Sequence, residues 1–485
     1  MKRTVLELVD EVNCRFHNLD ITTRRKLVNE VSFFLPYARH TPAFKLGRWD
    51  GKVHYCDIGA RSYINLLDRL LPVVQDCGYD VELLDNRSTG QFTFEKVAAN
   101  SYSHVVWPAG HVCEGEPIVL RDYQIEIVNE FLGNPQGVQC VSTGAGKTLV
   151  TAILSHKIEP YGRSIVIVPS KQLVKQTEAD YINLGLDVGV FFGDRKDYDK
   201  THTICTWQSL EALNKKSKDF DPAITLDMFI DGVTCIIVDE AHGAKADALK
   251  KMMTTAFANM QLRWGMTGTI PEDEHEAIAL YACIGNLINT VTAKELQDKG
   301  VLSNLHVHVQ QLKDPVRAFP NYQGEIAWLS SDRVRLEWLA EHIIEQSNSG
   351  NSLVLVPRKK TGQMLQALIP DSVYIDGSVK VKDRTDEYDE IRTSAGKVII
   401  ATAGVAAVGI DVPRIFNLYL FEPGKSFVRV IQSIGRGIRT AKDKDYVNIF
   451  DICSNCKYSK SHLTKRKKFY TGAQYPFTIK KVDYL

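Results

Sequence analysis

The chain has 485 residues and a formal net charge of +1, from 59 basic and 58 acidic residues. Hydrophobic residues make up 44% of it and charged residues 24%, which excludes a disordered chain, a collagen and a small disulfide scaffold. The balanced charge also excludes a globally basic nucleic-acid coat protein, but it does not exclude a local basic groove. A chain of this length is expected to form roughly two to four domains.

The sequence contains few features that indicate a cellular compartment. The ten cysteines are scattered, several of them inside apolar runs, and we interpret them as buried thiols in a reducing compartment. The first residues, MKRTVLELVDEVN, contain acids and no long apolar core, unlike a signal peptide. No stretch approaches the ~18 apolar residues of a membrane span. We therefore expect no membrane contact and a cytoplasmic location, in the host cytoplasm if a phage encodes the chain.

Residues 1–100 form the first predicted domain, a small α+β domain. Within residues 15–61, nine lysine and arginine residues face only four acids, and aromatic residues interleave with them. Basic groups neutralise phosphates and aromatic rings stack on bases, so this domain is predicted to bind DNA. Most of the aromatics are expected to form its core. Arg48 and Trp49, in the turn GRWDG, are the predicted contacts, and Trp49 is expected to be exposed.

After a predicted linker at 101–116, short apolar runs alternate with helix-length segments. The first group is VQCV (138–141), SIVIVP (164–169), TICT (203–206), TCIIVD (234–239) and LRWGMT (262–267). The second group is SLVLVP (352–357), SVYID (372–376), KVIIAT (397–402), IFNLYLF (415–421) and YVNIFD (446–451). This alternation predicts two α/β domains with parallel sheets, at 117–305 and 306–485, the second with a basic C-terminal tail.

The segment VSTGAGKT (141–148) lies between a predicted strand and a predicted helix, which is the context of a phosphate-binding loop. Its glycines allow backbone N–H groups to approach phosphate oxygens, and the helix adds its positive N-terminal dipole. Lys147 can reach the β- and γ-phosphates, and the Thr148 hydroxyl suits Mg²⁺. Val141 replaces the first glycine of the general pattern. The predicted nucleotide-binding residues here are Thr143, Gly144, Ala145, Gly146, Lys147 and Thr148.

The segment TCIIVDEAH (234–242) is a predicted buried strand that ends in two acids. Asp239 can hold Mg²⁺ through a water, and Glu240 can take a proton from the attacking water. His242 is predicted to link the nucleotide site to the next motif. The sequence thus predicts ATP and Mg²⁺ as cofactors.

These two motifs stand among others in a fixed order, and the chain resembles superfamily 2 helicases of the DExH group over nearly all of residues 117–451. The further motifs are LRDYQ (120–124), VPSKQLVKQ (168–176), TWQSL (206–210), TGT (267–269), ATAGVAAVGIDVP (401–413) and QSIGRGIR (432–439). Within the superfamily, PAFKLGRWDGKVHYCD (42–57) and VLSNLHVHV (301–309) are similar to phage UvsW-like helicases.

The resemblance implies two tandem RecA-like parallel-sheet domains, preceded by the small α+β domain, with ATP between the two. It implies nucleotide contacts at Arg121, Gln124, Gly409 and Asp411. It implies catalytic roles for Glu240, Gln432, Arg436 and Arg439. It implies that hydrolysis is coupled to domain movement through His242, Thr267, Gly268 and Thr269. It implies DNA contacts at Pro169, Ser170, Lys171, Thr206, Gln208 and Thr402.

The resemblance further implies an ATP-dependent DNA helicase that unwinds forked DNA and drives branch migration in replication, recombination or repair. Its partner would be forked, branched or single-stranded DNA. An RNA helicase and a duplex-DNA translocase of a restriction or remodelling assembly stay open as alternatives. The pair Asp239 and Glu240 argues against a clamp that binds ATP without turnover. No zinc is expected, because Cys453 and Cys456 lack a four-ligand spacing. The basic segment 457–470 suits an electrostatic contact with a strand.

Overall fold

The structure is a computed structural model that divides into two compact units. It describes residues 2–87, 90–109, 111, 113–217, 224–245, 247–271, 273–315, 317–376, 394–402, 414–424 and 444–484. The first unit contains Met1–Val141 and Gly146–Thr290, and the second contains Ser142–Ala145 and Val291–Leu485. Among the described residues, no helix is both long and apolar enough to cross a bilayer.

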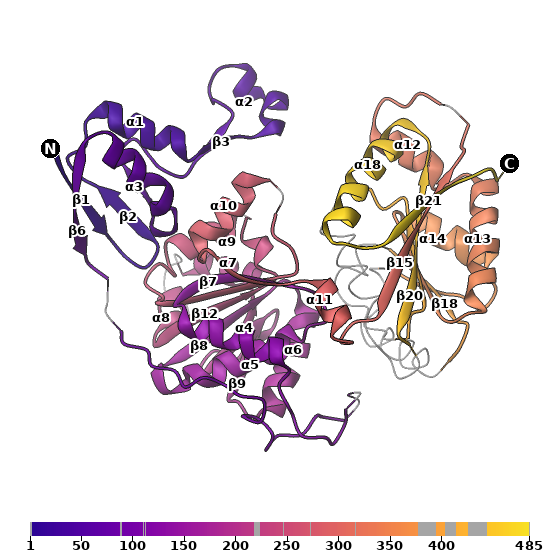
Figure 1. The fold of residues 1–485 in the computed structure, drawn as a ribbon, viewed down its shortest axis with the longest axis horizontal. Helices are drawn as coiled ribbons and strands as arrows, with labels where there is room; N and C mark the ends of the chain where they lie inside the picture. The colour runs from indigo at the N-terminus through magenta and orange to yellow at the C-terminus, as the bar shows by residue number, and fades with distance from the viewer. Residues whose placement is uncertain are drawn as a thin grey trace. The chain divides into compact units, whose positions relative to one another are not determined.

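The chain begins with a four-stranded sheet in the order β5-β2-β1-β6, in which β1 pairs with β6 in parallel and with β2 in antiparallel fashion. Its elements are β1 (Lys2–Leu8), β2 (Asn13–Phe16), α1 (Ile21–Glu30), β5 (Arg61–Tyr63), α3 (Leu67–Asp76) and β6 (Tyr79–Asp85). A small lobe, residues 32–54, projects from this sheet domain (Figure 1). The lobe contains β3 (Ser32–Phe34), α2 (Pro42–Lys45) and β4 (Lys52–His54), with β3 and β4 paired.

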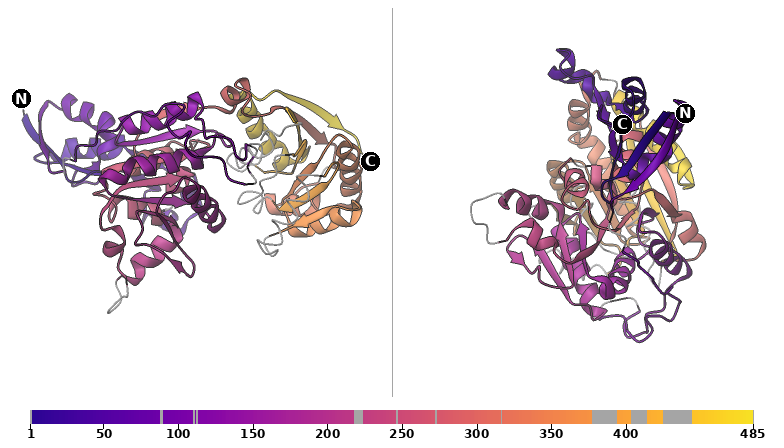
Figure 2. Two further views of the ribbon diagram at one scale, coloured as in Figure 1. Left: turned by 90° about the horizontal axis from the view of Figure 1, so that it is seen from below. Right: turned by 90° about the vertical axis from the view of Figure 1, so that its left-hand side faces the viewer.

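This N-terminal domain is built onto helix α10 (Glu274–Cys283), far along the chain (Figure 1, Figure 2). Ile278, Ala279 and Ala282 of α10 belong to the same buried core as the strands and helices of the four-stranded sheet. The Tyr55 hydroxyl also donates a hydrogen bond to the His275 carbonyl oxygen at 2.7 Å. The N-terminal domain therefore shares its core with the first unit rather than hanging from a linker.

The first large sheet has eight strands in the order β10-β9-β11-β8-β12-β13-β7-β14, and every neighbouring pair from β9 to β7 is parallel. The strands are β7 (Gln136–Val141), β8 (Arg163–Val168), β9 (Val188–Phe192), β10 (Arg195–Lys196), β11 (His202–Thr206), β12 (Val233–Asp239), β13 (Leu262–Thr267) and β14 (Leu287–Val291). The helices are α4 (Asp122–Gly133), α5 (Lys147–Ile158), α6 (Lys171–Asn183), α7 (Trp207–Lys216), α8 (Leu226–Ile230) and α9 (Asp247–Thr254). Figure 1 shows α4, α5 and α6 on one face, and α7, α9 and α10 on the other.

The second large sheet has seven strands in the order β17-β18-β16-β19-β20-β15-β21, all paired in parallel. The strands are β15 (Asn304–Leu312), β16 (Ser352–Val356), β17 (Val373–Ile375), β18 (Val398–Thr402), β19 (Asn417–Phe421), β20 (Tyr446–Ser454) and β21 (Phe477–Val482). In the part of this unit that the structure describes, the helices are α11 (Ala293–Asp298), α12 (Tyr322–Leu329), α13 (Arg333–Ser347), α14 (Lys359–Leu368) and α18 (Lys457–Gly472).

The predicted fold class, two parallel α/β sheets after a small α+β domain, is confirmed, and all ten predicted apolar runs lie on strands. The division between the units falls at residues 290 and 291, ahead of the predicted boundary at 305. The predicted basic tail differs most from expectation. Residues 457–470 lie in the helix α18, and β21 follows it and pairs with β15 at the edge of the second sheet.

The shared core around α10 gives a first prediction. Ala279→Asp places an unpaired carboxylate in that core, which should cost about 3–5 kcal/mol of folding free energy. Thermal unfolding of the full chain should show a midpoint lowered by roughly 10 °C. Ala212→Asp, the same change at an exposed position of α7, is the matched control and should move the midpoint little. Equal midpoints for the two variants would show that α10 does not depend on the N-terminal domain.

Candidate active site and nucleic-acid interface

The predicted motifs of the first unit gather at one edge of the eight-stranded sheet. Strands β11, β8, β12, β13 and β7 are consecutive and parallel, so their carboxyl ends meet at that edge. In such sheets, ligands bind outside the carboxyl ends of the strands. Three motif residues end these strands, Thr206, Asp239 and Thr267, while Pro169 and the loop before Lys147 follow them. The fold therefore brings together motifs that are up to 126 residues apart, from 141 to 267.

The loop after β7 has the backbone of a phosphate cradle. Gly144 has φ 90° and Gly146 has φ 83°, a left-handed conformation that favours glycine. A Cβ at Gly146 would meet the Gln124 Nε2 atom at 2.7 Å, so a larger residue would close the loop. The Thr143 hydroxyl oxygen is buried and has no hydrogen-bond partner among the described residues. Together with the N-terminus of α5, which begins at Lys147, this loop suits an anionic ligand.

Lys147 points from α5 toward the carboxyl end of β12. Its Nζ atom lies 3.4 Å from the Glu240 Oε1 atom and donates a hydrogen bond to the Val141 carbonyl oxygen at 3.4 Å. Burial lowers the pKa of the Lys147 ammonium, but the carboxylates of Glu240 and Asp239 raise it more, so its pKa lies above the ordinary value. Lys147 is thus a fixed cation beside the cradle, as the sequence predicts.

The two acids at the end of β12, Asp239 and Glu240, have pKa values shifted in opposite directions. Burial raises the pKa of the Asp239 carboxyl to about 6, although Lys147 acts in the opposite direction. Burial also acts to raise the pKa of Glu240, but the charges of Lys147 and His242 bring it below the usual range. Glu240 is therefore ionised and able to accept a proton, whereas Asp239 is a desolvated carboxyl that a divalent cation would stabilise as the anion. Glu240 also has φ 52°, a strained value for a residue other than glycine.

A short-range contact between His242 and Glu240, followed by hydrogen bonds, connects Glu240 with the next motif. The His242 Nδ1 atom lies 3.3 Å from the Glu240 Oε2 atom and 3.0 Å from the Thr267 hydroxyl oxygen. That hydroxyl donates to the Thr269 carbonyl oxygen at 2.8 Å and accepts a hydrogen bond from the Thr269 N–H. Gly268 lies within this turn. The predicted coupling residues are therefore in contact with the predicted catalytic base.

The predicted adenine-reading residues lie at the start of α4. The Arg121 backbone N–H donates a hydrogen bond to the Gln124 Oε1 atom at 3.1 Å, and Gln124 is buried beside Gly146. Arg121 is exposed, and its Nη1 atom donates to the Tyr123 hydroxyl at 3.2 Å. Gln124 is thus next to the phosphate loop, within reach of a nucleotide held there.

The predicted nucleic-acid contacts of the first unit differ in exposure. Pro169, Lys171 and Gln208 are exposed at the carboxyl edge, where they are accessible to a strand. Ser170 caps α6 by accepting a hydrogen bond from the Leu173 N–H at 3.3 Å. Thr206 is only 4% exposed, and its hydroxyl caps α7 through the Ser209 N–H, so its structural role is evident.

Of the predicted site residues in the predicted domain at 306–485, only one lies within the described residues. Thr402 is half-buried at the carboxyl end of β18. Gly409, Asp411, Gln432, Arg436 and Arg439 lie outside the described residues.

The N-terminal lobe corrects one expectation about exposure. Arg48 is exposed, but Trp49 is half-buried, and its indole N–H donates to the Lys52 carbonyl oxygen at 2.9 Å. Tyr37 and Leu46 are instead the most exposed large apolar side chains of the lobe, at 59% and 65%, ahead of Phe34. The aromatic pattern alone cannot show this, because the Trp49 hydrogen bond depends on the turn formed around it.

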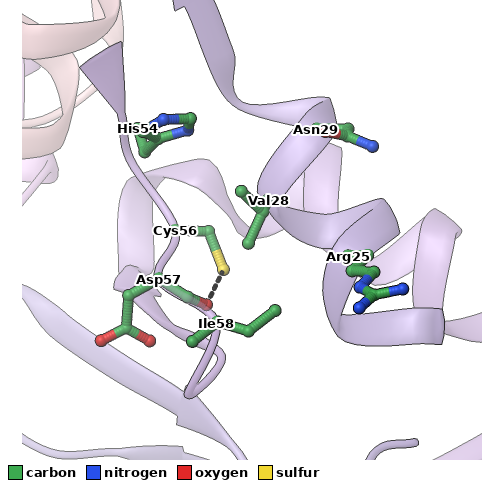
Figure 3. A pocket seen from close by; sticks show the side chains of 7 residues that line it. All are labelled: Arg25, Val28, Asn29, His54, Cys56, Asp57 and Ile58. Carbon is green, nitrogen blue, oxygen red and sulfur yellow. Dashed lines mark hydrogen bonds between the residues drawn. The ribbon is translucent and has the colours of Figure 1, made fainter. Parts of the chain in front are cut away.

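An open cavity of 410 Å³ lies at the root of this lobe, away from the phosphate loop (Figure 3). Val28 of α1 and Cys56 and Ile58, which follow β4, line it. Both ring nitrogens of the neighbouring His54 are already engaged, with Ser32 and with Asp50. His54 is therefore held in place by its neighbours, and the phosphate-loop and acidic motifs lie at the sheet edge rather than at this cavity.

The fold and this edge define an α/β nucleoside triphosphatase with two RecA-like sheets. Residues 117–272 match the family described as "Type III restriction enzyme, res subunit", and residues 334–441 match "Helicase conserved C-terminal domain". The chain belongs to the superfamily 2 helicases, and it is an ATP-dependent helicase that acts on nucleic acid.

Curated relatives are distant in sequence. The "ATP-dependent DNA helicase uvsW" of Enterobacteria phage T4 is 22% identical over 469 residues, covering 92% of this chain and 90% of the relative. "Putative helicase 22" of Sulfolobus islandicus filamentous virus is 23% identical, covering 69% and 64%. "DNA 3'-5' helicase XPB" of Kineococcus radiotolerans is also 23% identical, covering 75% and 65%. The chain thus spans most of the phage protein but less than two thirds of the other two.

Solved structures support the fold. A fragment of a putative HsdR subunit of a type I restriction enzyme from Vibrio vulnificus aligns with a TM-score of 0.56 at 16% identity, covering 97% of this chain and 85% of that one. Dbp5 of S. cerevisiae, bound to RNA and ADP BeF3, aligns with a TM-score of 0.52 at 16% identity, covering 76% and 90%. At such identities the likeness shows the fold alone.

Lys147→Ala should lower the rate of ATP hydrolysis by about a hundredfold or more, because the cation beside the phosphate cradle is lost. The measurement is phosphate release at saturating ATP and single-stranded DNA. Lys157→Ala, on the same helix and ten residues further along, is the matched control and should hydrolyse ATP at the wild-type rate. Hydrolysis by the Lys147 variant at the control rate would place the phosphates elsewhere.

Glu240→Gln should keep nucleotide affinity but lower kcat by about 10²–10⁴-fold, because only the proton acceptor is removed. Nucleotide affinity and kcat are measured separately, by equilibrium binding and by steady-state hydrolysis. Glu130→Gln, an exposed position of α4, serves as control. A lost affinity together with an unchanged kcat would exclude Glu240 as the base.

Proposed function

We propose that this helicase is a DNA motor that unwinds forked DNA and drives branch migration. The observation that carries the proposal is the shared sheet edge. Lys147 follows β7 at the start of α5, and Glu240 and His242 follow β12. The exposed Lys171 and Gln208 follow the neighbouring strands β8 and β11. A nucleotide and a strand bound at one edge are near enough for hydrolysis to alter the grip on the strand.

The choice of DNA rests on the relative that matches nearly the whole chain. The phage T4 relative is named an ATP-dependent DNA helicase, and the alignment covers 92% of this chain, so it extends beyond the two helicase families into the N-terminal domain. A relative that shared only the helicase families would not bear on the N-terminal domain. The proposed cellular role is in replication, recombination or repair.

We propose Mg²⁺ as the metal that accompanies ATP, and the residues at the sheet edge fit it. Asp239 is a buried carboxyl whose pKa burial raises, and Thr148 lies in the first turn of α5, beside the cradle. Asp239 and Thr148 would hold the cation, which neutralises charge on the transferred phosphate. The ionised Glu240 then orients the attacking water and accepts its proton, while Lys147 neutralises the phosphate oxygens.

The N-terminal lobe is the proposed contact with the branch point. It contains Arg39, Lys45, Arg48 and Lys52 against one acid, Asp50, and Asp50 pairs with His54 at 3.0 Å. The half-buried Trp49 supports the lobe, so Arg48 and the exposed Tyr37 are the side chains placed to meet DNA. Cations next to an exposed ring suit phosphates beside unpaired bases.

A duplex-DNA translocase is the second candidate. It is favoured by the match of residues 117–272 to the restriction-enzyme family and by the HsdR-like fold. A translocase moves along duplex DNA without separating its strands, so it displaces a third strand from a triplex but leaves a fork intact. An RNA helicase would prefer an RNA fork of the same sequence.

The deciding experiment compares four substrates under one condition. A DNA fork, a DNA four-way junction, an RNA fork and a DNA triplex are incubated with the protein and ATP, and strand release is measured. We expect release from the fork and the junction at least about tenfold faster than from the RNA fork, and none with Glu240→Gln. Release from the triplex alone would identify a translocase, and release from the RNA fork alone would identify an RNA helicase.

A further inference from the structure

The C-terminal part of the second unit has an unusual charge composition. Residues 452–482 contain no aspartate or glutamate, and they contain seven lysines and one arginine. Most of these cations lie in the helix α18 (Lys457–Gly472), which packs beside α12 (Figure 1). Because the segment is a packed helix, each of its side chains points in a fixed direction relative to the rest of the unit.

One face of α18 is anchored in the unit by a buried ionic network. Arg466 is 3% exposed, and its guanidinium donates to both carboxylate oxygens of Asp451 at 2.8 Å and to the Gly424 carbonyl oxygen at 2.7 Å. The Tyr470 hydroxyl also donates to Asp451, at 2.9 Å. At the start of the helix, the Ser459 N–H donates to a carboxylate oxygen of Glu325 at 2.6 Å. These contacts fix the rotation of α18 about its axis.

The opposite face is formed by lysines. The buried positions of α18 are Ser459, His462, Leu463, Arg466, Phe469 and Tyr470. The lysine face, which is exposed, consists of Lys457, Lys460, Lys465, Lys467 and Lys468. With 3.6 residues per turn, these five lysines share one arc of ~160°, centred opposite the buried positions. Lysines three residues apart on this face repel each other, which weakly destabilises the helix.

No carboxylate neutralises the lysine face in the part of the chain that the structure describes. None of its five lysines has an ion pair there with an aspartate or glutamate. Among the described residues, three acids contact α18 and all are buried: Asp451 is engaged by Arg466, Glu325 by the Ser459 N–H, and Glu422 by the Ser459 hydroxyl. The positive charge is therefore directed outward.

We propose that the lysine face of α18 binds the phosphate backbone of duplex DNA, separately from the motifs at the sheet edges. From Lys457 to Lys468 the helix rises about 16 Å, a length over which a duplex carries about ten phosphate charges. The exposed positions are lysine, serine, threonine and one glycine, and the one aromatic ring beside them, Tyr458, is half-buried and covered by Lys457. Single-strand sites rely on exposed rings on which unpaired bases stack, so this face suits a paired backbone.

The inference rests on the proposed function in one respect, since it gives the fork helicase a grip on the duplex that it opens. A duplex held by α18 would stay bound to the second unit while the motifs at the sheet edges handle the separated strand. An acidic protein or an RNA duplex could also meet five lysines, and the test separates them from DNA.

The experiment measures the salt dependence of duplex binding without ATP. The full chain is compared with a variant in which four lysines of the face become glutamine, which keeps helix propensity. The substitutions are Lys460→Gln, Lys465→Gln, Lys467→Gln and Lys468→Gln. Fluorescence anisotropy with a labelled 20-base-pair DNA duplex gives the affinity at several salt concentrations. The slope of log affinity against log salt should become shallower by about 0.9 for each lysine that contacts a phosphate.

The matched control removes the same charge from lysines that already pair with a carboxylate. Its substitutions are Lys2→Gln, Lys200→Gln, Lys294→Gln and Lys313→Gln. Thermal unfolding checks that both variants fold, and a variant with arginine at the four face positions should keep the wild-type slope. We expect the glutamine face variant to bind the duplex about tenfold or more weakly at 0.1 M salt, and the control to bind within about twofold of wild type.

Three results would overturn the inference, the last of them measured by the same titration with an RNA duplex of the same sequence. Equal slopes for the face variant and wild type would mean that DNA does not contact α18, as expected if an acidic protein docks there. Equal losses in the face variant and the control would mean that only net charge matters. A larger loss on an RNA duplex than on DNA would assign the face to RNA. If wild-type protein fails to unwind forks, the proposed function fails, but the slopes, measured without ATP, still decide the role of α18.

Discussion

The Lys147 ammonium and the Glu240 carboxylate lie 3.4 Å apart in the interior of the first unit, and either charge buried alone would be strongly destabilising. Their contact requires β7 and β12 to lie on either side of β13, with both carboxyl ends at one edge. The same parallel arrangement brings the other motifs of the first unit to that edge. A phosphate that binds Lys147 competes with Glu240 for the same cation, so the ion pair also ties nucleotide binding to the state of the base.

The consequences of that pair extend well beyond the sheet edge. Glu240 contacts His242, His242 contacts Thr267, and the turn at Thr269 leads along the chain to α10. Helix α10 contributes Ile278 and its neighbours to the core of the N-terminal domain. Ala241, next to Glu240, also shares a buried core with Leu280 and Cys283 of α10, so α10 packs against both the nucleotide site and the N-terminal domain. A shift of α10 has to move the domain packed on it, because packed interiors transmit strain rather than absorb it.

Much of this architecture is predictable from the sequence, since local signals determine it. Apolar β-branched runs define the buried strands, and a glycine-rich loop before a helix has few structural uses other than holding phosphate. What the sequence cannot supply are contacts between distant residues. The sharing of a core between residues near 27 and near 279 leaves no local pattern, since α10 is apolar on both faces. The burial of Trp49 depends on one hydrogen bond to the Lys52 carbonyl, and the direction of the α18 lysines depends on the Arg466 and Asp451 pair.

The net charge of +1 is a sum over positive and negative charges that lie in different parts of the protein. Several acids of the second unit are buried. Asp451 and Glu422 pair with buried arginines, and Glu325 accepts a hydrogen bond from a backbone N–H group. Each carboxylate used internally is one fewer at the surface, so the cations left outside, on α18 and on the N-terminal lobe, are not neutralised locally. Screening confines such charges to about 10 Å at moderate salt, so a polyanion responds to these faces rather than to the sum over the molecule. A protein with almost no net charge can therefore attract a polyanion such as DNA at its local positive faces and not over the rest of its surface.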